Sequence, residues 1–311
     1  MDFCGRGRPR SQDVCGRGRL HSQDNMAATA RLLACLAVGL LLCTGCGRSG
    51  KARTDGDGQA EVRPEVETRK VRHIVRQFPV YEDFNCITNI SSLHVVYEQG
   101  PCSVTAEGDS VIVSNLLYSN DSGGVTFSLA SEENFDMAQY DMASCATIRV
   151  SSPRLRIVAN CGAGTISCRG RVEGDEVLMG GIGSGLVEAD TVVCRVFRFE
   201  SNKLTDGRFG HIACEEGRVL NYGSARVEAT VEASRLAIFD VGNKGSLSVA
   251  ARAPRVEWVS TGSGDSRLLC DTPDLSLSHQ GTGTVTLEGH AVMKDIKKGS
   301  RSKLVNRLHM K

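Results

Sequence analysis

Eight cysteines beyond residue 80 carry the most reactive side chains: Cys86, Cys102, Cys145, Cys161, Cys168, Cys194, Cys214 and Cys270. The spacing between Cys194 and Cys214 equals one period of the glycine repeat described below, which would place them one above the other in a coiled chain. The spacing of neighbouring strands, about 4.8 Å, lies within the range of Cα separations that a disulfide allows. The sequence therefore allows a Cys194–Cys214 disulfide, and it equally allows two free thiols packed as small apolar groups.

Charged side chains offer candidates for polysaccharide cleavage, but none forms a convincing catalytic set. The basic candidates and their neighbour are Arg195, Arg198, Glu200, Arg252 and Arg255, and the acidic ones are Glu215, Glu216, Glu228 and Glu232. Glycoside hydrolysis needs two carboxyl groups about 5–10 Å apart, and these acids are equally typical of solvated strand positions. We expect no catalytic residue and no enzymatic activity.

Metal and cofactor sites are not predicted either. The only zinc-like spacing is His211-x-x-Cys214, which has no second half. Calcium-binding solenoids place an acid in every turn. After the second glycine of each repeat, only one acid occurs among Thr165, Leu186, Arg226, Ser246, Asp265 and Thr284. We therefore expect no metal and no cofactor.

The elements that position these residues are set by a glycine signature that returns about every 20 residues, a period that indicates a stacked architecture. Its corner glycines are Gly162, Gly164, Gly183, Gly185, Gly223, Gly242, Gly245, Gly262, Gly264, Gly281, Gly283 and Gly299. The unit at Asn202-Lys203 has lost both glycines. Glycine suits such corners because a Cβ would restrict the backbone angles and because stacked corners approach closely.

Short alternating runs flank the glycines. Val227, Ala229 and Val231 follow one corner at strand spacing, and residues 155–158, 177–179, 235–238, 255–259 and 275–278 precede others. Each unit thus reads as strand, corner, strand and turn, without room for a helix. We predict an all-β fold, a single-stranded β-helix or solenoid with about 20 residues per coil over residues 156–309. A β-sandwich is the alternative that such alternation also permits.

Composition agrees with thin coils: the 311 residues include 34 glycines and one tryptophan, and 5% are aromatic. Residues 1–45 hold six arginines and three aspartates, a net charge of +3, which leaves 31 basic and 33 acidic residues, a net charge of −2. The remainder therefore lacks the basic field of a nucleic-acid-binding protein, and we expect no nucleic-acid partner.

Residues 1–70 have the organisation of an exported protein. Residues 1–25 contain a tandem Arg/Gly repeat and are interpreted as an upstream extension before Met26. Residues 26–45 form a signal peptide, since the apolar run at residues 32–42 is too short to cross a membrane. Cys46 follows in a context similar to a bacterial lipobox and is the predicted lipidation site, although Cys43 stands where leucine is commonest; a signal peptide without lipidation is the alternative. Residues 46–70 are polar and form a flexible tether.

Residues 71–155 are β-rich but less regular. Val125, Phe127 and Leu129 alternate with polar residues, as in a strand, whereas residues 131–144 are acidic and break the pattern. An open end of a solenoid is an unpaired strand edge that requires a cap. We interpret this region either as that cap or as irregular first coils.

Taken together, these motifs resemble a known family. The lipobox-like Cys46, the strand at residues 93–100 that runs into residues 102–109, and the Gly-Ser-Gly units resemble the head-GIN domain family of auto-transporter adhesins from Bacteroidetes. The best repeat is Gly262-Ser263-Gly264-Asp265, and the match covers residues 71–307. The resemblance implies a right-handed coil and an exported envelope protein, and it transfers no catalytic residue.

These observations lead to an expected function. We expect a non-enzymatic lipoprotein of the cell envelope, anchored to the outer membrane by Cys46, that offers an elongated surface for adhesion or contact with an unknown protein or glycan. The face of the membrane is undetermined, and homo-oligomer formation is left open. The alternatives are a polysaccharide-processing β-helix enzyme and a solenoid that polymerises through its ends.

Overall fold

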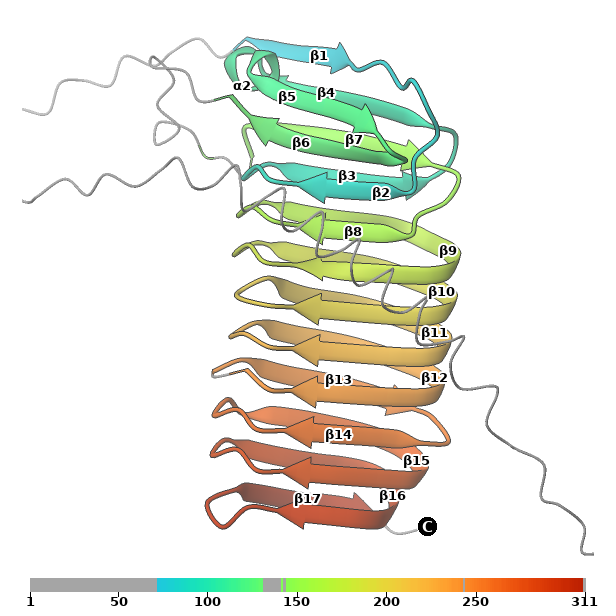
Figure 1. The fold of residues 1–311 in the computed structure, drawn as a ribbon, viewed down its shortest axis with the longest axis vertical. Helices are drawn as coiled ribbons and strands as arrows, with labels where there is room; N and C mark the ends of the chain where they lie inside the picture. The colour runs from blue at the N-terminus through green and yellow to red at the C-terminus, as the bar shows by residue number, and fades with distance from the viewer. Residues whose placement is uncertain (1–71, 131–140, 142–143, 243, 310–311) are drawn as a thin grey trace, which may run out of the picture.

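The computed structural model describes residues 72–130, 141, 144–242 and 244–309, without the side chains of residues 293–294. In this part, seventeen strands and the short helix α2 (Ser110–Ser114) form one elongated stack (Figure 1). The stack is a β-solenoid of about eight turns, so the predicted fold class is confirmed.

Parallel pairing between successive coils sets the repeat length. Val187 pairs with Gly207, Gly207 with Val227, and Val227 with Leu247, and these steps give roughly 20 residues per coil. The coils consist of β8 (Ile157–Asn160), β9 (Thr165–Gly181), β10 (Leu186–Ser201), β11 (Asp206–Asn221), β12 (Arg226–Asp240), β13 (Ser246–Arg252), β14 (Val256–Ser260), β15 (Ser266–His279), β16 (Thr284–Lys298) and β17 (Lys303–His309).

Each coil has two halves, one after its glycine corner and one before the next. The sequence pattern predicts a turn between the halves, and in most coils this is wrong: β9, β10, β11, β12, β15 and β16 continue from one half of the coil into the other. Strand pairing survives because the backbone of each coil follows that of its neighbour. Strands β13 and β14 are separate, and Pro254 lies between them; proline supplies no N–H to a ladder.

The amino-terminal region contains both a coil and its cover. Strands β2 (Cys86–Asn89) and β3 (His94–Gln99) pair in parallel with β8 and β9, so they are the first coil. The chain then leaves the coil path and returns as β6 (Gly124–Leu129) on β2 and β7 (Ala146–Ser152) on β3. Antiparallel β5 (Leu116–Asp121), β4 (Ser103–Asp109) and β1 (His73–Gln77) complete this end.

The core is a narrow interior filled by columns of side chains from both halves of each coil. One column runs through Val158, Met179, Phe199, Val219, Ile238, Trp258 and Leu277, each paired in register with the next. All of these side chains are buried, including that of Trp258 at 1% exposure. Such burial is the main stabilising contribution of a solenoid, in which each coil contacts only its neighbours.

Candidate functional site

The corner glycines stack backbone on backbone. A Cβ at Gly183 would lie under 3.0 Å from the carbonyl oxygen of Gly162, and a Cβ at Gly281 would overlap that of Gly262 in the same way. Overlap with a backbone carbonyl of the preceding coil recurs at Gly162, Gly164, Gly185, Gly223, Gly242, Gly245, Gly264 and Gly283. At Gly299 the nearest atom is instead the Ser302 side-chain oxygen, at 3.0 Å.

Backbone angles are not the reason for these glycines. Positive φ values in the described residues occur at Gly108, Gly123, Gly170, Gly180 and Gly289 among the glycines, all outside the corner set. The expectation that the corners need angles restricted by a Cβ is therefore wrong. Close approach between coils is the physical cause, because a Cβ would enter the space of a backbone carbonyl of the preceding coil.

A column of buried polar residues lies just before each corner and was missed in the sequence. Its members are Asn89, Asn160, Ser201, Asn221, Asp240, Ser260 and His279, each at most 1% exposed. Several bond the carbonyl four residues ahead: Asn160 Nδ2 donates to Gly164 O at 2.7 Å, and His279 Nε2 lies 3.0 Å from Gly283 O. The column thus satisfies corner carbonyls that burial would otherwise leave unpaired. The signal was present, since a polar residue precedes most corner units by two positions.

Asp240 is the carboxylate of this column. Its oxygens accept hydrogen bonds from Asn221 Nδ2 at 3.2 Å and from Ser266 Oγ at 3.0 Å. Burial nevertheless raises the pKa of Asp240, because desolvation disfavours the charged form more than these donors favour it. The folded protein therefore binds this proton more tightly than the unfolded chain, and the stability from protonation is lost as pH rises through the folded-state pKa.

Asp240→Asn is therefore expected to stabilise the protein at neutral pH by about 1 kcal/mol, because the amide carries no charge and can keep both partners. Thermal unfolding followed by circular dichroism would show a rise of about 2–4 °C. The difference in stability between Asp240→Asn and the wild type should shrink as pH falls towards the ordinary pKa of aspartate, because Asp240 is then protonated in the wild type too. Asp265→Asn, at an exposed carboxylate, is the control and should change little. A gain that does not depend on pH would contradict the explanation.

Cys194 and Cys214 lie side by side in register on β10 and β11, and both are free thiols in the structure. Burial raises the pKa of Cys194 to about 12 and that of Cys214 to about 11. Because the thiolate is the reactive species and such pKa values keep little of it at neutral pH, both cysteines should react slowly in the folded state. The disulfide stays a prediction, favoured by the register of the pair.

Alkylation of the native protein at pH 8 is expected to modify Cys194 and Cys214 at least about 100-fold more slowly than a model thiol. Peptide mass spectrometry after iodoacetamide treatment would measure this. After denaturation without reductant, iodoacetamide should label both cysteines if they are free thiols. If they form a disulfide, both should stay unlabelled until reductant is added. Rapid labelling in the native state would contradict the burial that the structure shows.

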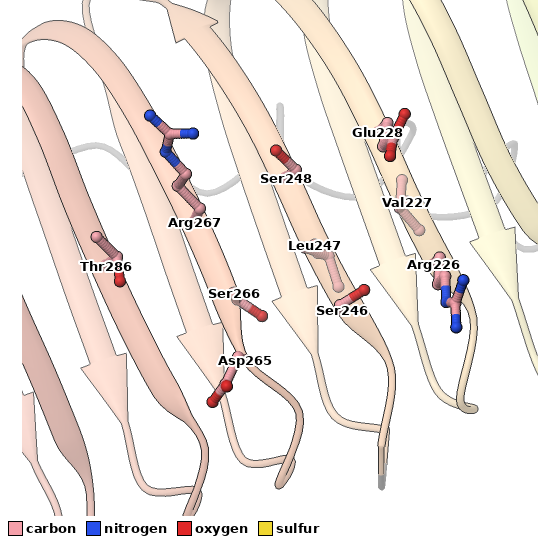
Figure 2. A pocket seen from close by; sticks show the side chains of 10 residues that line it. All are labelled: Arg226, Val227, Glu228, Ser246, Leu247, Ser248, Asp265, Ser266, Arg267 and Thr286. Atoms are coloured by element: carbon pink, nitrogen blue, oxygen red, sulfur yellow. The ribbon is translucent and has the colours of Figure 1, made fainter.

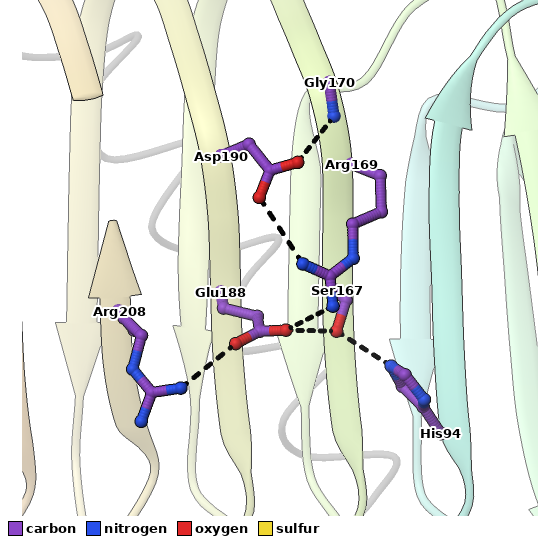
Figure 3. Close-up of polar contacts among 7 residues, drawn as sticks. All are labelled: His94, Ser167, Arg169, Gly170, Glu188, Asp190 and Arg208. Atoms are coloured by element: carbon purple, nitrogen blue, oxygen red, sulfur yellow. Dashed lines mark hydrogen bonds and ion pairs between the residues drawn. The ribbon is translucent and has the colours of Figure 1, made fainter. Parts of the chain in front are cut away.

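A polar network crosses four strands on the outer side of the first half-coils (Figure 3). His94 Nε2 lies 2.8 Å from Ser167 Oγ, which donates to Glu188 Oε1 at 2.6 Å. Glu188 also accepts from Arg169 at 2.9 Å and from Arg208 at 3.4 Å. Burial lowers the pKa of His94, and Arg169 adds to the effect.

This network contains a histidine beside a serine, yet its geometry does not suit nucleophilic catalysis. Ser167 is 0% exposed, so a substrate would not reach its hydroxyl. The Ser167 proton is directed to Glu188, whose charge is already balanced by two arginines. The arrangement is that of cross-strand pairs that stabilise neighbouring coils.

The charged residues considered for polysaccharide cleavage are distributed along the stack in separate ion pairs. Arg195 bonds Asp175 at 2.8 Å and lowers its pKa. Arg198 bonds Glu200 at 2.7 Å. The other pairs are Arg255–Glu257, Arg218–Glu216 and Arg208–Glu228. Arg252 lies in register between Glu232 and Asp271 on neighbouring strands. Glu215 remains an exposed residue of β11.

The outer side of the stack carries two shallow hollows that share Arg226 and Glu228; one extends over β9, β10, β11 and β12, and the other over β12, β13, β15 and β16. One has a volume of about 340 Å³ and reaches Asp206 and Arg208, and the other has a volume of about 240 Å³ and reaches Asp265 and Arg267. Figure 2 shows the second, with Arg226 and Glu228 on the outer surface and Ser246 and Ser248 between them and Arg267. We call Asp206, Arg208, Arg226, Glu228, Asp265 and Arg267 the charged face.

Neither a metal centre nor a membrane helix is found in the described ranges. No three histidine, cysteine or acidic side chains there are grouped so that they could bind a metal ion. The same part of the chain contains no helix of the length and hydrophobicity that crossing a membrane requires. Cys46 and the tether, residues 46–70, lie outside the described residues, as do residues 1–45.

Solved structures with the same fold include three from Parabacteroides species. A candidate adhesin from Parabacteroides distasonis is 15% identical, with a TM-score of 0.62, over 78% of this chain and 97% of that one. One from Parabacteroides merdae is 14% identical, with a TM-score of 0.61, over 76% and 96%. A candidate lipid binding protein from Parabacteroides distasonis is 16% identical, with a TM-score of 0.55, over 76% and 95%.

These similarities define the class of the protein by its fold, a β-solenoid. No protein-family model matches the chain, and no curated protein matches its sequence. Identities of 14–16% carry the fold and not the function. Membership of the head-GIN domain family therefore stays a prediction.

Proposed function

We propose that this protein is a non-enzymatic adhesin-like protein of the cell envelope, of the head-GIN domain type, in which the solenoid presents an elongated surface to a protein or glycan. The observation that carries the proposal is the charged face, a shallow surface that extends over several coils. The names of the solved structures with this fold, candidate adhesins, support it. The separate ion pairs along the stack support a binding surface rather than a catalytic cleft.

Arg226 is the residue of the charged face that is best placed to contact a ligand. Its side chain is exposed between the two hollows, and the structure gives its guanidinium no ion-pair partner in the described part of the chain. Its backbone N–H is already used, since it donates to Asp206 at 2.7 Å. A free guanidinium can bind a carboxylate or a polar glycan group with two parallel hydrogen bonds.

The test is a screen of the purified protein against glycans, matrix proteins and envelope extracts. Arg226→Glu should weaken any binding found there by about tenfold, while Arg235→Glu, an exposed arginine of the opposite half-coil, should not. Absence of any ligand, or equal loss in both variants, would contradict the proposal. Turnover of a polysaccharide would favour an enzyme instead.

Lipid anchoring through Cys46 is the second part of the proposal. It depends on the apolar residues 32–42 and the small residue Gly45 that precedes Cys46. Labelling of growing cells with a fatty acid should mark the wild type and leave Cys46→Ala unmarked. Equal labelling of both proteins would contradict anchoring at this residue, and an unlabelled wild type would favour export without lipidation.

A further inference from the structure

The two ends of the stack are built differently. At the amino-terminal end, helix α2 packs beside β1 and β4, and its Ile112 and Val113 are fully buried in the core. Asp109 Oδ1 accepts the N–H of Val111 at the start of the helix, and Arg76 donates to the Val113 carbonyl. The amino-terminal end is therefore partly covered, and its edge strands in the described part of the chain are β1, which pairs with β4 alone, and β5, which pairs with β6 alone.

The carboxyl-terminal end has two free strand edges within the described chain. Strand β17 pairs with β16 alone, and the second half of β16 pairs with β15 alone. The N–H of Leu308 bonds the side chain of Asn306 and not β16, so even-numbered residues of β17 direct their backbone groups to the free side. Such an edge can accept a further strand.

Apolar side chains accompany these edges. Val292 is 40% exposed and Ile296 is 42% exposed on the second half of β16. Leu304 and Leu308 of β17 pack on the core but are only partly buried. A strand added to β17 would cover the interior that the last coil leaves open, which gives it an apolar contribution in addition to backbone hydrogen bonds.

The charge of this end determines which kind of strand fits. Exposed basic residues surround it: Lys297, Lys298, Arg301, Lys303 and Arg307. Asp295 pairs with Lys297, and Glu288 pairs with Arg307, which leaves an excess of positive charge. A second copy joined through the same end would bring like charges together, and at the opposite end α2 packs beside the edge strand β1. Insertion into lipid would bury unpaired backbone groups in hydrocarbon, which proteins avoid.

We propose that the carboxyl-terminal end of the solenoid binds an acidic segment of a partner protein, which adds to β17 as a further strand. This inference rests on the proposed function, because it places one contact of the adhesive surface at this end. Lysines on a strand edge also discourage uncontrolled pairing. Protection of the edge against uncontrolled pairing does not, however, explain why partly exposed apolar residues lie along it.

Fluorescence anisotropy with a labelled peptide of alternating glutamate and valine, added to the full chain, tests the proposal. We expect this peptide to bind, more weakly in high salt, and peptides of alternating lysine and valine or glutamate and proline not to bind. The proline peptide keeps the charge but lacks the N–H of every second residue, and it therefore cannot form the regular ladder of a strand. Equal binding of the glutamate–proline peptide would overturn strand addition, and binding of no peptide would overturn the proposal as a whole.

Two pairs of variants locate the site. Asn306→Pro removes an outward N–H and should weaken the peptide at least about tenfold, whereas Asn306→Ala keeps that N–H, frees the N–H of Leu308 and should bind at least as well as the wild type. Lys298→Glu with Lys303→Glu should weaken binding by a similar factor, unlike Lys203→Glu with Lys244→Glu at distant corners. Equal effects within either pair would contradict the location.

The remaining outcomes separate this inference from the proposed function. Stronger binding to anionic vesicles than to the acidic peptide would overturn it in favour of a lipid surface, and concentration-dependent self-association that the charge reversals abolish would overturn it in favour of a second copy. If the protein binds a target in the screen above but no acidic peptide, the inference fails and the proposed function stands. If the protein binds neither a target in the screen nor the acidic peptide, the inference and the proposed function are both contradicted.

Discussion

Gly183→Ala is expected to destabilise the protein by at least about 3 kcal/mol, a large effect for one added methyl group. The new Cβ would overlap the backbone carbonyl of Gly162 on the preceding coil. A neighbouring side chain could rotate away from the new methyl group, but the Gly162 carbonyl is part of the backbone and cannot. This carbonyl also accepts the N–H of Ser184 at 3.1 Å. The two coils would have to separate at the corner and lose part of their pairing.

Denaturant unfolding of Gly183→Ala, followed by circular dichroism, measures the effect. Gly100→Ala is the matched control, since the nearest atom to its Cβ would be 4.0 Å away. That variant should change the free energy of unfolding by less than about 1 kcal/mol. If the two variants lose a similar free energy of unfolding, the coils accommodate a methyl group at the corner. Close approach of the coils would then not be the reason for the corner glycines.

Trp258→Ala is expected to lower the free energy of unfolding by about 3–5 kcal/mol. Trp258 is the largest fully buried side chain and lies between Ile238 and Leu277 of the coils on either side. Its neighbours are held by their own strand pairing and cannot collapse into the space. The cavity would therefore remain, and both adjacent coils would lose contacts.

Trp258→Phe separates loss of volume from loss of polarity. The indole Nε1 is buried without a hydrogen-bond partner in the described part of the chain, so phenylalanine removes an unsatisfied donor while keeping a ring. We expect this variant to lose about 1–2 kcal/mol at most. Since Trp258 is the only tryptophan, its fluorescence also reports the unfolding of its coil in every other variant. A Trp258→Ala loss below that of Trp258→Phe would contradict the packing argument.

The repeating architecture could be predicted from the sequence, because the same physical demand recurs in each coil. The spacing of Gly162, Gly183 and Gly223 reflects the length of backbone that closes one turn, and the alternation at Val227, Ala229 and Val231 reflects which side chains enter the core. Both are local patterns that strand geometry imposes on neighbouring residues. The missing glycine at Lys203 did not hide the period, since the flanking coils keep their register.

Other features depend on residues that are distant in the sequence. Strand β3 lies between β7 and β9, which follow it only after a long intervening stretch of chain, and no local pattern records this placement. The network of His94, Ser167 and Glu188 arises only from that stacking. The buried column that contains Asp240 has a sequence signal, but its meaning follows from the burial of the corner.

By itself, the sequence determined that the chain is all-β and coiled with a regular period, since glycine corners and alternating strands are properties of contiguous residues. Only the tertiary structure decided why the corners are glycine, which charges pair along the faces, and which end is covered. Those features result from the approach of one coil to the next. Helix α2 packs beside β1 and β4 at one end, and at the other end β17 pairs with β16 alone among the described residues.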